Sequence, residues 1–165
     1  EGLSKTAQIK WVNDVLFAGK KVSGVITSTV TKGKNVEHAI FGIGVNIAAT
    51  PLLTPGQFVQ VPTCLREVSP DTIISQQVFL PRLLESLINR HKQLLNQGPD
   101  PLLSDYIHHS GVIGRNVEIW EEPSNRSMDP VMIAQGKVEN ILPDLSIKLK
   151  NRSNPICRGR LILVN

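Results

Sequence analysis

The feature that most constrains this chain is a pair of strand-forming segments separated by a tight turn. Residues 22–30 (VSGVITSTV) are rich in β-branched side chains, and residues 38–47 (HAIFGIGVNI) are almost continuously apolar. The intervening sequence Lys32-Gly33-Lys34-Asn35 is typical of a turn. We therefore predict two paired strands, with residues 38–47 buried on both faces because an unbroken apolar run leaves no polar face for solvent.

The rest of the first two thirds predicts one more strand and two helices. Residues 7–17 indicate a strand that ends at the polar pair Asn13-Asp14, followed by a turn at residues 19–21. Residues 48–68 carry three prolines and predict an irregular surface connection.

The first helix is expected to begin at the N-cap Ser69 and to end before Gly98, with Pro81 causing either a kink or a later start. Residues 101–108 predict a second, short helix.

Beyond Gly111 the sequence changes to short β-rich stretches. They cover residues 117–120, 131–141, 145–150 and 161–164. Several short strands in about 55 residues favour a small barrel, because closure removes exposed strand edges. We therefore expect an α+β protein with one domain at residues 1–110 and a second at residues 111–165.

Composition limits the classes of function. The chain has 165 residues and a formal net charge of +4, a mild excess that favours anionic partners such as nucleotides. No run of basic residues occurs, so nucleic acid is not the expected partner. Cys64 and Cys157 stand far apart and form neither a disulfide framework nor a CxxC metal motif. No apolar stretch is long enough to span a bilayer and no secretory signal opens the chain, so we expect a cytoplasmic protein.

Three short motifs contain the candidate site residues: Lys10-Trp11-Val12-Asn13-Asp14, Gly19-Lys20-Lys21-Val22-Ser23-Gly24 and Gly42-Ile43-Gly44-Val45-Asn46. Glycine inside a strand costs entropy and packs no side chain, so Gly24, Gly42 and Gly44 indicate close approach of a ligand or of another backbone. Ordinary turn chemistry and tight sheet packing explain the same spacing, and Gly-x-Gly without a following helix is not a dinucleotide fingerprint.

Polar side chains in these motifs suit an anionic ligand. Asn13, Asp14 and Asn46 offer oxygen ligands that would orient a polar group or hold Mg²⁺. Lys21 offers a flexible point charge for a phosphate or a carboxylate. The residues by themselves thus leave a small-anion site as one interpretation of the three motifs.

The same segments resemble the biotin-protein ligases, also called holocarboxylase synthetases or biotin-[acetyl-CoA-carboxylase] ligases. The resemblance lies in IKWVNDVLFAGKKVSGVITSTV, in FGIGVN and in PTCL at Pro62–Leu65, so it covers about residues 8 to 65. In that family the corresponding motifs read Lys-Trp-Pro-Asn-Asp, then Lys-x-x-Gly-Ile after a basic turn, then Gly-x-Gly-x-Asn. Few families join the three in this order.

The resemblance implies a mixed-sheet catalytic domain of the class II tRNA synthetase type, followed by a small SH3-like β-barrel. It implies a ligase that uses Mg²⁺ and ATP to convert biotin to biotinyl-5'-AMP. The biotin would then pass to a lysine on the biotin carboxyl carrier domain of a carboxylase. Besides this carrier domain, biotin and ATP, a second copy of the chain is a candidate partner.

Site roles follow from the resemblance, position by position. Lys21 would be the catalytic residue, contacting the biotin carboxylate and the adenylate phosphate. Asn13, Asp14 and Asn46 would serve ATP, with Asp14 and Asn46 as magnesium ligands. The full set that would bind biotin or the adenylate is Lys10, Trp11, Asn13, Asp14, Lys21, Gly24, Val25, Gly42, Gly44 and Asn46. From the usual role of aromatic rings alone, Trp11 is interpreted as a packed core ring rather than a stacking platform.

Two departures from the family pattern leave alternatives open. Val12 stands where the family has proline, so a fixed φ is lost. The family's Gly-Arg-Gly-Arg adenylate loop precedes the Lys-Trp motif and is not found in the nine residues before Lys10, so we expect a C-terminal portion of a ligase. Arg158-Gly159-Arg160 adjoins a predicted barrel strand and is interpreted as unrelated to that loop.

The alternatives are a non-catalytic fragment or pseudoenzyme that binds ligand or carrier protein without turnover, and a lipoate-protein ligase. The Lys-Trp-x-Asn-Asp spelling and the appended barrel favour biotin over lipoate. A biotin-operon repressor would need an N-terminal helix-turn-helix, which these residues do not contain.

Overall fold

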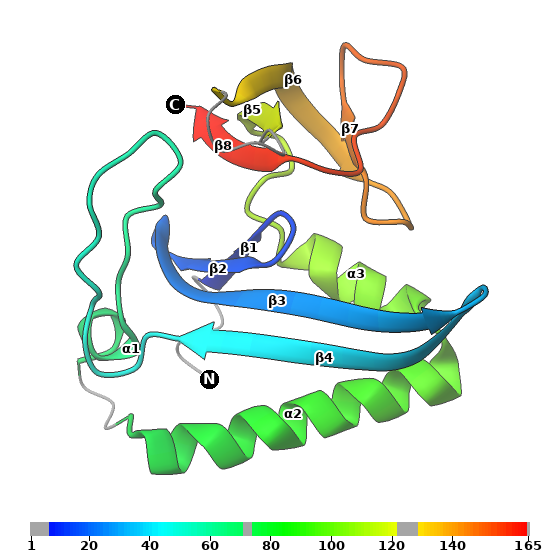
Figure 1. The fold of residues 1–165 in the computed structure, drawn as a ribbon. Helices are drawn as coiled ribbons and strands as arrows, with labels where there is room; N and C mark the ends of the chain where they lie inside the picture. The colour runs from blue at the N-terminus through cyan, green and yellow to red at the C-terminus, as the bar shows by residue number, and fades with distance from the viewer. Residues whose placement is uncertain (1–6, 71–73, 122–128, 165) are drawn as a thin grey trace. The chain divides into compact units, whose positions relative to one another are not determined.

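The computed structural model describes residues 7–70, 74–121 and 129–164, which divide into two compact units (Figure 1). Unit 1 takes its described residues from 1–55 and 59–84, and unit 2 takes its own from 56–58 and 85–165. The division falls within one long helix, between Leu84 and Glu85.

Unit 1 contains a four-stranded antiparallel sheet. Its strands are β1 (Ala7–Lys10), β2 (Asp14–Phe17), β3 (Lys20–Lys32) and β4 (Asn35–Val45), in the order β1-β2-β3-β4 (Figure 1). The predicted hairpin at residues 22–47 is confirmed as β3 and β4, which pair from Ser23 and Val45 to Lys32 and Asn35 around a turn at Gly33. Gly33 adopts φ 61°, a conformation that glycine reaches at little cost. A mixed sheet was expected, but the strand pairs described here are all antiparallel; a parallel contact occurs at the isolated bridge between Lys21 and Pro62.

The structure corrects the prediction for residues 7–17. They form two strands instead of one, because the chain turns at residues 11–13 and Asp14 pairs back with Lys10. The turn predicted at residues 19–21 lies one position earlier, at Ala18 and Gly19, so Lys21 is already inside β3. The polar pair Asn13-Asp14, predicted to end a strand, therefore lies at the turn of a β-hairpin.

The predicted burial of β4 on both faces is wrong. Ile40 is 66% exposed and its neighbour Phe41 is 61% exposed, although their side chains point to opposite faces of the sheet. β4 is the last strand in the sheet order, with β3 as its one strand neighbour there. Apolar composition favours burial, but burial needs an element on each face, and no described residue covers this part of the strand deeply.

The helices are α1 (Leu65–Val68), α2 (Gln76–Gln97) and α3 (Asp100–His108). The helix expected from Ser69 begins instead at Gln76, where Ser75 Oγ accepts a hydrogen bond from Val78 N at 3.4 Å; part of the expected first turn, residues 71–73, lies outside the described residues. Pro81 lies inside α2. Of the two effects predicted for it, a kink or a later start, the helix shows the later start. The predicted end at Gly98 is confirmed, with φ 77° and a bond from its N–H to Leu94 O.

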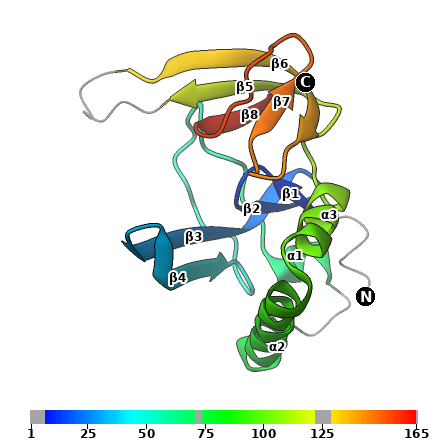
Figure 2. The ribbon, with the colours of Figure 1, turned by 90° about the vertical axis from the view of Figure 1, so that its right-hand side faces the viewer.

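Unit 2 contains a second antiparallel sheet. Its strands are β5 (Asn116–Glu121), β6 (Val131–Ile141), β7 (Ile147–Leu149) and β8 (Arg160–Val164), in the order β7-β6-β5-β8; Figure 2 shows β6 beside both β5 and β7. The strands predicted beyond Gly111 are therefore present. Alternate side chains on them fill a core of fully buried aliphatic groups: Val117, Ile119, Val138, Ile141, Ile147, Leu149 and Leu161.

The short segment 56–58 belongs to unit 2 through an aromatic contact. The Phe58 ring meets the Trp120 ring edge to face, with centroids 5.6 Å apart. The Arg160 guanidinium lies 5.4 Å from the centroid of the same Phe58 ring. Rings in this arrangement and a cation over a ring face are both favourable, so Phe58 is an anchor for its loop.

Within the described ranges, none of the helices combines the length and the apolar character required to cross a membrane.

Candidate functional site

The hairpin of β1 and β2 brings two lysines to one carboxylate. Lys10 and Asp14 are paired in register across the turn, and their charged groups lie 3.8 Å apart. Lys21, from the start of β3, places its Nζ 2.6 Å from Asp14 Oδ1. Lys10 is only 7% exposed, an unusual position for a lysine unless it has a partner. The three groups form a cluster with one more positive than negative charge.

A β-bulge sets the position of Lys21. Val15 pairs with Ser23 and Leu16 pairs with Lys21, so Val22 is an extra residue in β3. The Val22 side chain is buried, and its carbonyl accepts a hydrogen bond from Asn46 N at 2.9 Å. Bulges of this kind bend a strand and redirect its side chains, which is how β3 presents Lys21 to Asp14.

Gly24 shows the close approach that its position in a strand predicted. A Cβ built on Gly24 would lie 3.1 Å from Asp14 Oδ1 and 3.1 Å from Lys21 Nζ. A side chain here would push into the ion pair, so the absence of a Cβ gives Asp14 and Lys21 the space to meet. At Gly24 the close neighbour is thus a pair of side chains of the chain itself.

Gly42 and Gly44 show no such crowding. Gly42 pairs with Ile26 and Gly44 pairs with Gly24, and the nearest atoms to a Cβ at these sites are carbonyl oxygens at 3.8 and 3.9 Å. These are ordinary van der Waals distances, so the fold would accept a Cβ at either position and does not itself require glycine there. A role in lining a ligand cleft remains a prediction for Gly42, Gly44 and the half-buried Val25.

The two asparagines of the motifs hold backbone segments. Asn13 accepts from Val25 N at 3.0 Å, and its side-chain amide donates to Val25 O. Asn46 Nδ2 donates to Thr63 O at 2.9 Å. The nitrogen of each amide is therefore used within the chain, while Trp11 is 5% exposed, in keeping with its interpretation as a packed ring.

The predicted magnesium ligands Asp14 and Asn46 do not form an obvious metal site. Each Asp14 oxygen faces a lysine amine, at 2.6 Å for Lys21 and 3.8 Å for Lys10. Among the described residues no group of three His, Cys, Asp or Glu side chains gathers as a metal site would need. A carboxylate already paired with ammonium groups is poorly suited to Mg²⁺.

Sequence reasoning missed the segment that flanks Lys21. Lys21 N donates to Val61 O and Thr63 N donates to Lys21 O, both at 2.8 Å, so the backbone of Lys21 is held on both sides by residues 61–63. Thr63 is 1% exposed, and its hydroxyl donates to Glu67 Oε2 at 3.0 Å. The sequence signal that could have identified this segment was PTCL at Pro62–Leu65, which formed part of the family resemblance. No residue of PTCL was assigned a role from the sequence.

Glu67 accepts a second hydroxyl as well. Thr50 Oγ1 donates to Glu67 Oε1 at 2.6 Å. Hydrogen bonds from Thr50 and, to a smaller extent, Thr63 hold the pKa of the Glu67 carboxyl below its ordinary value of 4.5, because they favour its charged form.

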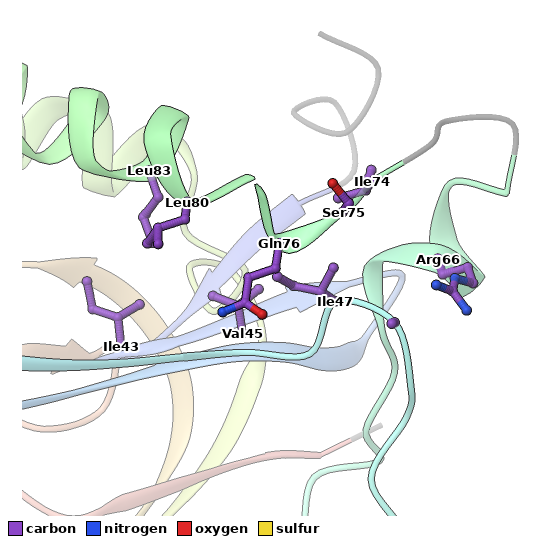
Figure 3. A pocket seen from close by; sticks show the side chains of 10 residues that line it. Ile43, Val45, Ile47, Arg66, Ile74, Ser75, Gln76, Leu80 and Leu83 are labelled. Carbon is purple, nitrogen blue, oxygen red and sulfur yellow. The ribbon is translucent and has the colours of Figure 1, made fainter. Parts of the chain in front are cut away.

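A separate cavity of about 580 Å³ lies between β4, the residues after it and the start of α2 (Figure 3). Ile43, Val45 and Ile47 line one side, and Leu80 and Leu83 line another. None of the predicted site residues contributes to its lining. The cavity is mainly aliphatic, whereas the Lys10–Asp14–Lys21 cluster is ionic, so the two are different environments within unit 1.

The Arg158-Gly159-Arg160 sequence lies in unit 2, where its arginines have local partners. Arg158 forms an ion pair with Glu121 at 2.7 Å, and Arg160 lies over Phe58. The interpretation of this sequence as unrelated to an adenylate loop is consistent with these contacts.

Comparison with known proteins shows which family the sequence around the Lys10–Asp14–Lys21 cluster resembles. Residues 1–46 match the model of the biotin/lipoate A/B protein ligase family. The resemblance that the three sequence motifs predicted is thus confirmed. This matched region contains Lys10, Asp14, Lys21 and both glycines of Gly42-Ile43-Gly44.

Two individual relatives are similar over about two thirds of the chain. The bifunctional ligase/repressor BirA of Bacillus subtilis (strain 168) is 28% identical over 109 residues, 66% of this chain and 33% of BirA. The biotin--[acetyl-CoA-carboxylase] ligase of Paracoccus denitrificans is 28% identical over 112 residues, 66% of this chain and 45% of that protein. The chain therefore spans less than half the length of the relatives that it matches.

Solved structures give the same result for the fold. The apo biotin protein ligase from Aquifex aeolicus superposes with a TM-score of 0.72 at 20% identity, covering 99% of this chain and 68% of that one. The same enzyme in complex with biotin and ATP gives a TM-score of 0.70, also at 20% identity, covering 99% of this chain and 65% of that one. The α+β architecture with two antiparallel sheets is thus that of the biotin protein ligases.

Proposed function

We propose that this chain is the C-terminal portion of a biotin-protein ligase, an ATP-dependent enzyme that forms biotinyl-5'-AMP and transfers biotin to a lysine of a carboxylase's biotin carboxyl carrier domain. The observation that carries the proposal is the cluster of Lys10, Asp14 and Lys21 over Gly24, which lies inside the segment that matches the ligase family. The cluster carries one more positive than negative charge and therefore favours an anionic ligand.

Lys21 is the residue that would act on the anion. Its side chain is 38% exposed, so an incoming carboxylate or phosphate can approach it beside Asp14. The net positive charge of the three groups attracts such an anion, and the fixed ion pair orients the amine before the ligand arrives. Charge developing on the adenylate during acyl transfer would be stabilised by this preplaced cation.

The finer parts of the proposal concern the other site residues and the cofactors. Biotin and ATP are the substrates, and both occur in the complex of the Aquifex aeolicus enzyme. Mg²⁺ would accompany the ATP phosphates, without a ligand role assigned to Asp14 or Asn46. Asn13 and Asn46 would shape the site through the backbone segments that they hold, and Gly42, Gly44 and Val25 would line the biotin cleft.

The part of unit 2 from residue 111 onward, which contains β5 to β8, corresponds in this proposal to an SH3-like barrel that follows the catalytic domain at residues 1–110. The support is its short antiparallel strands and its aliphatic core. The carrier domain is the proposed protein partner and the cytoplasm the proposed location, where the carboxylases of this chemistry would be modified.

Calorimetric titration of the 165-residue chain with biotin, and separately with a non-hydrolysable biotinyl-AMP analogue, tests the proposal. Micromolar or tighter binding of the analogue is expected, with biotin alone binding more weakly because it offers fewer anionic groups to Lys21. A chain that is folded by circular dichroism and binds neither compound contradicts the proposal.

Lys21→Ala is expected to weaken analogue binding by roughly ten- to a hundredfold, the effect of losing a hydrogen bond to a charged group. Lys148→Ala is the matched control, since Lys148 is also a half-exposed lysine in an ion pair, with Glu139 at 3.2 Å in unit 2. Equal affinities of the two variants, with native circular dichroism spectra, would remove Lys21 from the site.

A further inference from the structure

The segment that brackets Lys21 is itself held at its far end. Residues 61–63 bond to Lys21 through Val61 O and Thr63 N, but a single bridge between short segments is weak on its own. Additional contacts from Thr63 must therefore set where this segment lies.

Thr63 makes two further hydrogen bonds, one with Asn46 and one with Glu67, and Glu67 also bonds to Thr50. Thr63 O accepts from Asn46 Nδ2 at 2.9 Å, and the Thr63 hydroxyl donates to Glu67 Oε2 at 3.0 Å. The other oxygen, Glu67 Oε1, accepts from Thr50 Oγ1 at 2.6 Å. Thr50 lies in the connection after β4 and Thr63 lies just before α1, so one carboxylate joins the two ends of this long connection.

Backbone bonds run along the same junction. Leu65 N donates to Asn46 O at 2.8 Å and Arg66 N donates to Ile47 O at 3.0 Å. These bonds place α1, and Glu67 with it, against the residues that follow β4. The Glu67 side chain is exposed on its outer side, whereas Thr63 is buried, so the carboxylate closes the junction from the solvent side.

We propose that Glu67 is a positioning residue: by accepting the Thr50 and Thr63 hydroxyls it holds residues 61–63 against β3 and thereby places Lys21 for its anionic ligand. The identity of that ligand rests on the proposed function. The two hydrogen bonds that Glu67 accepts from Thr50 and Thr63, called the clamp below, lie within unit 1 and do not depend on it. Glu67 does not touch Lys21; it acts through Thr63.

Amide hydrogen exchange, followed by NMR on the full chain, tests the clamp without any ligand. In Glu67→Ala the amides of Lys21 and Thr63 are expected to exchange about three- to tenfold faster, because the bonds that they make to Val61 O and Lys21 O open more often. The Ile119 amide in unit 2 is expected to keep its wild-type rate. Glu85→Ala, which removes an exposed carboxylate from α2, is the matched control and should change neither site.

Conservative variants of Thr63 separate the clamp from a general loss of structure. Thr63→Val keeps the shape and removes the hydroxyl, and it should reproduce the exchange of Glu67→Ala; Thr63→Ser restores the hydroxyl and should return it toward wild type. The double variant Glu67→Ala/Thr63→Val should exchange no faster at Lys21 than Glu67→Ala alone, since Glu67→Ala already removes the bond from the Thr63 hydroxyl.

Binding of the biotinyl-AMP analogue completes the experiment. Glu67→Ala and Thr63→Val are expected to weaken it severalfold, and Thr63→Ser to restore it. Unchanged exchange at Lys21 and Thr63 in Glu67→Ala overturns the clamp whatever the analogue does. Faster exchange in a chain whose wild type binds no analogue supports the clamp and counts against the proposed function instead.

Discussion

The two sheets of this molecule use similar strands with opposite results. In unit 2 the aliphatic side chains of β5 alternate inward, and Val117 and Ile119 are 1% and 0% exposed. In unit 1 the longer hairpin β3–β4 leaves Ile26 76% exposed and Ile40 66% exposed. Both regions are rich in β-branched and aliphatic residues, so composition does not account for the difference. The difference lies in how deeply each strand is packed, which its own composition does not set.

The contrast also separates stability from function. The buried groups of unit 1, among them Leu16, Val22 and Cys64, gather where β2, the start of β3 and the residues before α1 meet. The Lys10–Asp14–Lys21 cluster lies on that same packed end of the sheet. A polar cluster needs rigid surroundings to keep its geometry, and the exposed part of the hairpin does not provide them.

The strongest test of the contrast is one substitution made in both sheets. Ile119→Ala in β5 is expected to destabilise the chain by about 2–5 kcal/mol, because it leaves a cavity in a filled core. Ile40→Ala in β4 should change stability by no more than about 0.5 kcal/mol, since the side chain is already mostly in water. Urea unfolding midpoints measure both, and comparable losses would show that the hairpin is buried in solution.

A pair of glycines gives the next largest effect. Gly159 adopts φ 124°, and a Cβ there would lie 2.7 Å from Ile119 Cγ2 and 3.0 Å from Trp120 O. Gly159→Ala is therefore expected to cost about 1–3 kcal/mol through strain and overpacking. Gly42→Ala meets nothing closer than 3.8 Å and should be nearly neutral for folding. Thermal melting of the two variants decides; a larger loss for Gly42→Ala would contradict the comparison.

Removing the aromatic anchor of unit 2 should have a smaller effect. Phe58→Ala is expected to cost about 1 kcal/mol through loss of the edge-to-face contact with Trp120 and to shift tryptophan emission to longer wavelength as Trp120 gains solvent contact. Phe41→Ala in β4, where the ring is 61% exposed, is the control. Identical emission from the two variants would mean that Phe58 does not pack on Trp120 in solution.

The smallest effect expected is the dependence of stability on pH. Hydrogen bonds lower the pKa of Glu67 in unit 1, mainly from Thr50, and of Asp144 in unit 2, from the Ser146 hydroxyl and backbone. Since the folded pKa is the lower one, the stabilisation is complete above the ordinary values of 4.5 and 3.8 and is lost as pH falls through the folded values.

Glu67→Gln and Asp144→Asn should each flatten the acid side of a plot of urea midpoint against pH. Glu85→Gln, on the exposed surface of α2, should leave the curve unchanged. A steeper acid limb in either of the first two variants would reverse the sign assigned to that carboxyl.

The sequence predicted correctly those features of the fold that depend on a few neighbouring residues. The turn at Gly33, the helix end at Gly98 and the strands of unit 2 follow from backbone conformation and side-chain alternation within a few residues. The motifs of the candidate site were visible in the same way, since Lys10, Asp14 and Lys21 lie within twelve residues of one another. Their spacing along the chain did not reveal that a reversal at residues 11–13 and a bulge at Val22 bring them together.

What the sequence by itself determined is thus most of the strands and the two longer helices, the motifs shared with biotin-protein ligases and the residue types available to meet an anion; it missed α1 and the division of residues 7–17 into two strands. The tertiary structure alone decided which apolar strands are buried, as at Ile119 and Ile40, and which polar groups share a partner, as Thr50 and Thr63 share Glu67. The reason is physical: backbone preference acts between neighbours in the chain, whereas burial and ion pairing depend on distances in space that only the packed chain defines.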